Sequence, residues 1–209
     1  MSNITHAKTK KIAIGLSGGV DSTVAGLLLK EQGYELHGVF LECYKTPGCR
    51  VEDDRKDALD VALRLGITFE VIDLKKEYKQ RVLDLYFEEL RAGRTPNPDI
   101  ACNSEIKFGL FYDWAMRKGF DAVATGHYAD IRPISSARPK RLGLHQPVDK
   151  QKDQTYFLYR LRQDQLEHVL FPLAGLQKQA VRELATSHGF RTASKPDSQG
   201  ICFIGEMNV

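Results

Sequence analysis

The residues best suited to chemistry lie in a glycine-rich turn at positions 14–22, IGLSGGVDS, which follows an apolar run and leads into TVAGLLLK. A helix that begins after a strand presents unpaired backbone N–H groups and the positive end of its dipole. Gly18 and Gly19 let the backbone approach a ligand closely, while Ser17 and Ser22 add hydroxyl donors. The turn therefore predicts an anion-binding site, and phosphate is the anion that such turns commonly hold.

Asp21 adds a carboxylate to this turn, where it would hold Mg²⁺ against phosphate oxygens. The alternative is a plain turn in which Ser22 caps the helix, and a lone SGG would favour that alternative. The turn has neither the lysine of the G-x-x-x-x-G-K-[ST] loop nor the spacing of G-x-G-x-x-G. It is therefore not one of these two common nucleotide-binding motifs.

The other reactive side chains are four widely separated cysteines, Cys43, Cys49, Cys102 and Cys202. This spacing differs from the dense disulfide framework of a small secreted domain, so we expect thiols in a cytoplasmic protein. Cys43 and Cys49 supply only two ligands, and no nearby histidine completes a zinc site. We expect these two to be incidental thiols.

Composition describes a globular chain of 209 residues, with 42% hydrophobic residues and a formal charge of +3. The longest apolar runs are far shorter than the roughly 18 residues that span a bilayer, so we expect no membrane contact. Residues 132–152 hold six lysines and arginines against one aspartate, a local charge of +5. That stretch is either a solvated loop or a surface for a polyanion such as nucleic acid.

Hydrophobic periodicity predicts an α/β fold in which an open, mostly parallel sheet carries helices on both faces. The expected strands are 10–16, 35–42, 68–74 and 121–127, and the expected helices are 22–32, 51–65, 76–91 and 104–118. Residues 132–152 are predicted to form a loop or hairpin, followed by helices over 155–171 and 177–190. We expect a catalytic domain over 1–131, the basic loop over 132–152 and a helical extension over 153–209.

Five segments together resemble a known family. The turn matches the S-G-G-x-D-S loop of the PP-loop ATP pyrophosphatase superfamily, whose members cleave ATP between the α and β phosphates. The remaining segments resemble the tRNA-specific 2-thiouridylases, in the same order along the chain: AGRTPNPDIACNSEIKFG (92–109), ATGHYA (124–129), KDQTYFLYRL (152–161) and DSQGICFIGE (197–206). The resemblance implies a Rossmann-like, adenine nucleotide alpha hydrolase-like fold. It also implies that sulfur replaces the C2 oxygen of the wobble uridine after ATP has adenylated that oxygen.

The resemblance also implies roles for individual residues. Cys202 would carry a persulfide received from a sulfur-donor protein, and Cys102 would close a disulfide with it while Asp99 moves a proton or positions the base. ATP, with Mg²⁺ at Asp21, would contact Gly15, Leu16, Ser17, Gly18, Gly19, Val20, Asp21, Ser22, Leu41 and Gly126. The tRNA would contact Asn97, Pro98, Asp99, His127, Lys152, Asp153 and Gln154.

Plainer roles compete with some of these assignments. A cysteine is often a small buried apolar residue, although the Pro- and Asn-rich setting of Cys102 predicts exposure, with Asn103 or Ser104 capping a helix that starts near Glu105. Asp99 alternatively caps a turn after proline, and a lone histidine such as His127 is often structural. Family members continue into a central domain and a C-terminal β-barrel, so we expect the chain to stop where the central domain starts. The rival functions are another adenylating enzyme of the superfamily, such as a lysidine synthase or an amide-forming synthetase, or a non-catalytic module that binds ATP or RNA.

Overall fold

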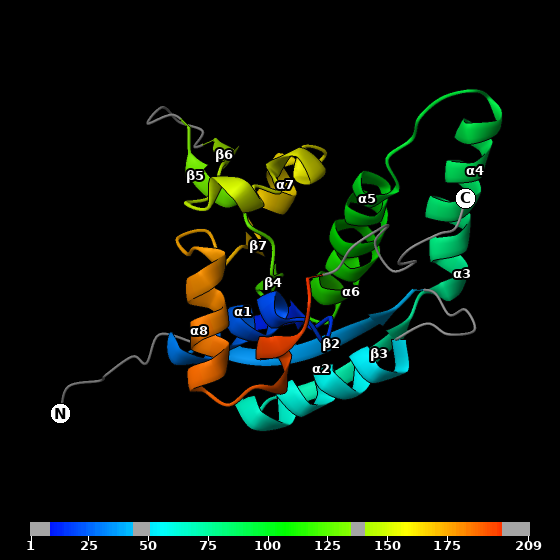
Figure 1. Cartoon of the computed structure of the whole chain (residues 1–209). Coiled ribbons are helices and arrows are strands. Elements are labelled where there is room, and N and C mark those ends of the chain that lie inside the picture. Colours follow the sequence, from blue (N-terminus) through cyan, green and yellow to red (C-terminus); the bar gives the residue numbers. More distant parts are fainter. Residues whose placement is uncertain (1–8, 44–50, 135–140, 198–209) are drawn as a thin grey trace.

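The computed structural model describes residues 9–43, 51–134 and 141–197. Five parallel strands form one sheet in the order β3–β2–β1–β4–β7 (Figure 1). Their bounds are β1 (Lys11–Gly15), β2 (Glu35–Glu42), β3 (Thr68–Asp73), β4 (Ala122–Ala124) and β7 (Val169–Leu170). This sheet and the helices around it confirm the predicted α/β class.

Helices cover both faces of the sheet because successive side chains of a strand point to opposite sides. Ile12 and Ile14 of β1 pack in one core with α1, α2 and α8, and Ala13 packs in a second core on the other face. The helices of the first core are α1 (Val20–Glu31), α2 (Val51–Leu65) and α8 (Lys178–Ser187). The second core involves two continuous helical rods. The first rod consists of α3 (Lys75–Tyr78), η1 (Lys79–Leu83) and α4 (Asp84–Arg91). The second rod consists of α5 (Pro98–Ala101), η2 (Cys102–Phe111) and α6 (Tyr112–Arg117). Segments η1 and η2 are π-helical.

The strand order fixes where a ligand would bind. From β1 the chain adds β2 and β3 on one side, whereas β4 and β7 lie on the other side of β1. The loops that leave β1 and β4 therefore diverge at the carboxyl edge of the sheet. Open α/β sheets bind their ligands at such a switch point.

The second half of the described chain departs from the sheet and returns to it. Strands β5 (Asp130–Pro133) and β6 (Leu142–His145) form an antiparallel hairpin, as predicted for this region. The prediction of a single helix over 155–171 is wrong. The segment instead holds a 3-10 turn η4 (Thr155–Leu158), the short helix α7 (Gln163–Leu166) and β7, whose Val169 pairs with β4. Burial of this short apolar run against β4 outweighs its helical pattern.

Two helices start earlier than expected. The first begins at Val20 rather than residue 22, and the rod that contains Cys102 begins at Pro98 rather than near residue 104. Proline is well suited to the first position of a helix, because its missing N–H would be unpaired there. The domain boundaries at residues 131 and 152 remain predictions. Over the described ranges, none of the helices is long and apolar enough to cross a membrane.

Candidate functional site

The glycine-rich turn lies at the switch point and connects β1 directly to α1. Gly15 ends β1, the backbone N–H of Leu16 donates to Val39 of β2 at 2.8 Å, and Val20 starts α1. The N-cap is Gly19, which has no side-chain cap, so the alternative in which Ser22 caps the helix is wrong. The first N–H groups of α1 are left to a ligand at this end of the helix.

The two serines hold the shape of the turn. The Ser22 hydroxyl accepts the Ser17 backbone N–H at 3.1 Å and donates to the Gly19 carbonyl at 3.1 Å. The Gly19 carbonyl also accepts the Thr23 hydroxyl at 2.9 Å. These bonds fold the turn back onto the first turn of α1.

Two glycines are required by close backbone contacts. Gly18 has a φ of +76°, and a Cβ there would lie 2.2 Å from the Asp54 carbonyl oxygen at the start of α2. Gly126 follows β4, and a Cβ there would lie 2.6 Å from the backbone nitrogen of Ser22. The loop after β4 thus packs directly against the start of α1, and both loops of the switch point form one surface.

Asp21, which is partly exposed, belongs to an ion-paired cluster. Its two carboxylate oxygens accept hydrogen bonds from the Lys178 ammonium of α8 at 2.6 and 2.8 Å, and the Tyr128 hydroxyl donates to it at 2.9 Å. Burial, followed by the neighbouring Asp21 charge, raises the pKa of Tyr128 far above its usual value, so this hydroxyl stays a donor. Lys178 also lies 5.8 Å from the centre of the Tyr128 ring, a cation–π contact.

A second carboxylate, Asp197, extends this cluster. Lys152, Lys178 and Arg182 contact it at 2.6, 2.9 and 2.6 Å. Burial alone would raise the pKa of Asp197, but hydrogen bonds from Lys152 and Lys178 outweigh burial and lower its pKa to about 2. Asp197 is therefore ionised at neutral pH, and three cations surround one negative charge.

Lys195 ties the same C-terminal segment to the turn. Its ammonium donates to the Gly18 carbonyl at 3.0 Å and pairs with Asp54 at 2.6 Å and Asp57 at 2.5 Å. Burial would lower the pKa of Lys195, yet the hydrogen bonds that its ammonium donates to these two carboxylates raise the pKa. The turn, α2 and the segment before residue 198 are thus joined by one charged side chain.

The candidate catalytic residues of the central loop lie on the rod of α5 and η2. The Asn97 side chain accepts the backbone N–H groups of Asp99 and Ile100, which makes it the N-cap, and Pro98 takes the first helical position. Asp99 is half-buried, and it shares a helix face with Cys102 three residues later. The exposure predicted for Cys102 is wrong, because the helix starts earlier and the cysteine is 0% exposed in the second core.

His127 and Leu41, which were expected near ligands, lie below the surface. His127 packs its ring against Phe108 and Phe171, and its Nδ1 lies 2.7 Å from the Thr125 hydroxyl. Burial, aided by the Lys107 charge, holds the pKa of His127 well below its usual value, so the ring is neutral. The Leu41 side chain lies in the core that contains Phe108 and Phe171, and the residue is 7% exposed. The roles of both residues toward tRNA and adenine remain predictions.

Lys152, Asp153 and Gln154 support the local structure. Gln154 accepts the Tyr128 backbone N–H through its side chain at 2.9 Å, and Asp153 accepts the Thr155 backbone N–H at 3.0 Å. Lys152 pairs with Asp197, and Lys178 links Asp197 to Asp21 of the turn. The segment therefore lies beside the turn. Cys202 and Cys49 fall outside the described residues, whereas Cys43 is buried in the second core.

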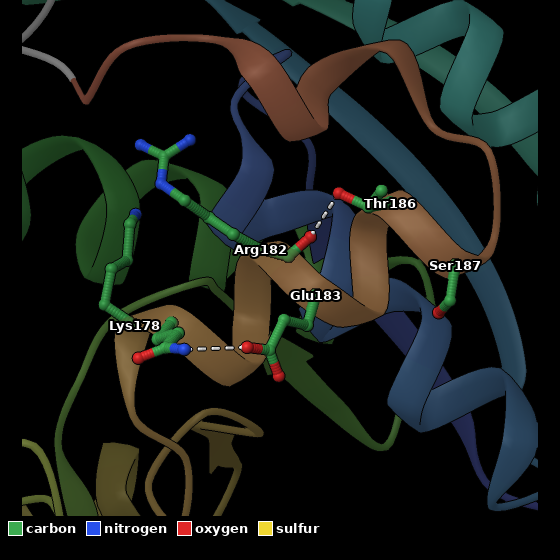
Figure 2. A pocket seen from close by; sticks show the side chains of 6 residues that line it. Lys178, Arg182, Glu183, Thr186 and Ser187 are labelled. Carbon is green, nitrogen blue, oxygen red and sulfur yellow. Dashed lines mark hydrogen bonds between the residues drawn. The ribbon is translucent and has the colours of Figure 1, made fainter.

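A shallow pocket runs along α8, lined by Lys178, Gln179, Arg182, Glu183, Thr186 and Ser187. Figure 2 shows Lys178 and Arg182 extending in one direction from the helix, with Glu183 on a different side, where Gln179 donates to it at 2.9 Å. Within the described part of the chain, no group of three or more His, Cys, Asp or Glu side chains is placed to hold a metal ion.

The chain is similar to known proteins over most of its length. The profile of the family described as the tRNA methyl transferase HUP domain matches residues 10–206. The chain belongs to this family. It is 49% identical over 202 residues to the tRNA-specific 2-thiouridylase MnmA of Streptococcus pyogenes serotype M49 (strain NZ131). These aligned residues cover 95% of the chain and 53% of that protein. The chain spans about half the length of the curated relatives that it matches.

Solved structures show that the family's fold extends to more distant proteins. The U34-tRNA thiolase NcsA from Methanococcus maripaludis with its [4Fe-4S] cluster superposes with a TM-score of 0.60 at 19% identity, covering 97% of this chain and 64% of that one. A 4-thiouridine synthetase in complex with RNA and bound ATP gives 0.58 at 21% identity, covering 93% and 45%. At these identities the likeness establishes a shared fold.

Several residues of this HUP domain site were not found from the sequence. Tyr128, Lys178, Arg182 and Lys195 all reach the turn or its partners, and Asp54 packs against Gly18. Tyr128 lies inside the quoted segment ATGHYA, so the resemblance contained a signal for it. Lys178 and Arg182 are ordinary surface cations of an amphipathic helix, and nothing local marks them.

Proposed function

We propose that the chain carries out the ATP-dependent steps of 2-thiolation at the wobble uridine of tRNA. The observation that carries this proposal is the turn at the switch point, where Gly18 and Gly126 bring two loops against the open N-terminus of α1. The curated relatives at about 50% identity are tRNA-specific 2-thiouridylases, which supports the same reaction.

The first chemical step would be adenylation. Uracil O2 is a poor leaving group, and bonding it to AMP would make it a better one. The oxygen would attack the α-phosphorus of ATP, and pyrophosphate would depart. The N–H groups at the start of α1 would hold the phosphates. Gly126 leaves room because it has no side chain, and Leu41 would face the adenine. A bound ATP in the 4-thiouridine synthetase of the same fold supports this use of the site.

The second step would exchange oxygen for sulfur. The outer sulfur of a Cys202 persulfide attacks C2, and AMP leaves with the former O2. The Cys102 thiolate then attacks the inner sulfur of Cys202, which forms a Cys102–Cys202 disulfide and releases the thiolated base. A disulfide needs Cα atoms within roughly 4.4–6.8 Å of each other. Because Cys102 is 0% exposed in the structure, its thiol must become accessible to Cys202 during the reaction. Asp99, on the same helix face as Cys102, would position the base or move a proton.

The tRNA would bind across the basic hairpin and the segment that follows it. Asn97, Pro98, Asp99, His127, Lys152, Asp153 and Gln154 are the proposed contacts. Phosphate contacts from the local charge of +5 would make affinity fall steeply with salt. The target base would have to leave its stack to reach the site, as bases do in other base-modifying enzymes.

Magnesium, a persulfide-carrying donor protein and a cytoplasmic location complete the proposal. Both oxygens of Asp21 accept hydrogen bonds from Lys178, so the described residues do not fit a magnesium ion held by Asp21 in this arrangement. No step above depends on such an ion. Mg²⁺ would enter as part of the nucleotide substrate, and Asp21 would have to leave Lys178 to reach it.

Mass spectrometry of nucleosides tests the proposal. Substrate tRNA is incubated with the chain, ATP and a persulfide donor, and 2-thiouridine is the expected product. A methylated base would favour the activity named in the family description, and a lysidine-type product would favour another adenylating enzyme. Nucleotide or RNA binding without any modification would favour the non-catalytic module. Cys202→Ser is the matched control, in which thiolation stops while pyrophosphate exchange continues.

A further inference from the structure

Asp197 occupies a ring of cations beside the glycine-rich turn. Lys152 comes from the loop after the hairpin, and Lys178 and Arg182 lie one helical turn apart on α8. All three contact the Asp197 carboxylate within 2.9 Å. Figure 2 shows Lys178 and Arg182 reaching the same way from the helix.

Three cationic side chains of the cluster converge on one carboxylate, that of Asp197. Lys152, Lys178 and Arg182 face Asp197 and, through Lys178, Asp21 of the turn. The Asp149 carboxylate also contacts the cluster, because it accepts the Lys178 backbone N–H, so three carboxylates balance the three cations. The Lys178 side chain is only 13% exposed, so solvent screens it weakly. Such a set of donors suits an anion with more than one charge and several acceptor oxygens.

Lys178 joins this cluster to the turn. Its ammonium bridges Asp21 in the first turn of α1 and Asp197, at 2.6 and 2.9 Å. A chain of phosphates that starts at the N-terminus of α1 would therefore meet the α8 cations next. The Asp149 carboxylate accepts the Lys178 backbone N–H at 2.9 Å, which fixes this end of α8.

The segment that holds Asp197 is anchored across the turn. The Thr192 hydroxyl donates to Thr23 of α1 at 3.0 Å, and Lys195 donates to the Gly18 carbonyl at 3.0 Å. Arg182 donates to the carbonyl oxygens of Ala193 and Lys195 at 2.8 and 2.9 Å. Asp197 is the last described residue of this segment, five positions before Cys202 in the sequence.

We propose that Lys178 and Arg182 bind the outer phosphates of the nucleotide and the pyrophosphate product, in competition with the Asp197 carboxylate. This inference rests on the proposed function, because it assigns new residues to the same nucleotide site. Pyrophosphate offers several charged oxygens where Asp197 offers one carboxylate. Phosphate binding would release Asp197 from α8, so nucleotide occupancy would be linked to the position of the segment that ends at Asp197.

The test compares affinities for inorganic pyrophosphate, measured by titration calorimetry with Mg²⁺ present. Asp197→Asn removes the competing charge, and we expect pyrophosphate to bind about two- to fivefold more tightly, which is the range expected for losing one partly exposed ionic competitor. Glu183→Gln is the matched control, because it removes one negative charge from another side of α8. A gain in affinity cannot result from misfolding.

Lys178→Met provides the opposite change. We expect it to weaken pyrophosphate binding about tenfold or more, and to reduce the gain that Asp197→Asn produces when the two are combined. Equal affinities for the unsubstituted chain, Asp197→Asn and Glu183→Gln would overturn the inference and leave the proposed function intact. Failure of the unsubstituted chain to bind either ATP or pyrophosphate would instead refute the proposed function, and this inference with it.

Discussion

A methyl group at position 126 would collide with the backbone that forms the proposed nucleotide site. The Cβ of an alanine there would lie 2.6 Å from the backbone nitrogen of Ser22 and 2.7 Å from the carbonyl carbon of Asp21. Ordinary contacts begin at 3.4 Å, so the loop and the start of α1 must separate by about 0.8 Å. Backbone lies on both sides of this contact, and no flexible side chain can move away to relieve it.

Two consequences follow for Gly126→Ala. Overpacking of this kind costs about 1–3 kcal/mol of unfolding free energy, or about 2–12 °C in melting temperature for a chain of this size. The proposed nucleotide site would be displaced as well, and a misplacement near 1 Å can reduce a rate about 100-fold. We expect Gly126→Ala to lower pyrophosphate exchange by roughly that factor.

The assay pairs pyrophosphate exchange with thermal unfolding. Gly175→Ala is the matched control, because a Cβ at that position would meet nothing within 4 Å. We expect the control to retain its exchange rate and melting temperature. Unchanged exchange and stability in Gly126→Ala would refute the reasoning that the two loops form one rigid surface.

Three further predictions concern individual side chains. Tyr128→Phe deletes the hydroxyl that donates to Asp21, and chemical denaturation should show a loss of about 1–2 kcal/mol of unfolding free energy; an unchanged midpoint would contradict this. His127 is buried with a lowered pKa, so protonation of its ring favours the unfolded chain. The free energy of unfolding should therefore fall as the pH drops below about 6.5, by up to about 1.4 kcal/mol per pH unit. His127→Gln should remove that dependence on pH. Cys102→Ser and Cys202→Ser should each abolish thiolation and retain pyrophosphate exchange, and joint loss of both activities would argue against separate roles for the turn and the thiols.

Sequence patterns predicted the elements that local periodicity specifies. The apolar runs of β1, β2 and β3 lie within their expected ranges, because buried parallel strands need continuous hydrophobic residues. The short strand β7 was missed. Only Val169 and Leu170 pair with β4, and this run is too short to stand out from the helix-like pattern around it. Its strand conformation depends on a partner 46 residues earlier in the chain.

The site shows the same division between local and distant information. The turn and Gly126 could be predicted from motifs, and the start of the helix at Pro98 had its usual signal in Asn97 and proline. The charged cluster could not be predicted, because Lys178 pairs with Asp21 across 157 positions. Such pairs are fixed by tertiary packing and leave no spacing to detect.

The nucleotide products show which bond of ATP the chain breaks, and so whether the turn supports adenylation. ATP labelled at the α-phosphate is incubated with the purified chain, tRNA and magnesium, and the labelled products are separated. We expect tRNA-dependent formation of labelled AMP with release of pyrophosphate, because the proposed role of the turn at the end of β1 is to direct cleavage between the α and β phosphates. Labelled ADP in place of AMP would contradict it.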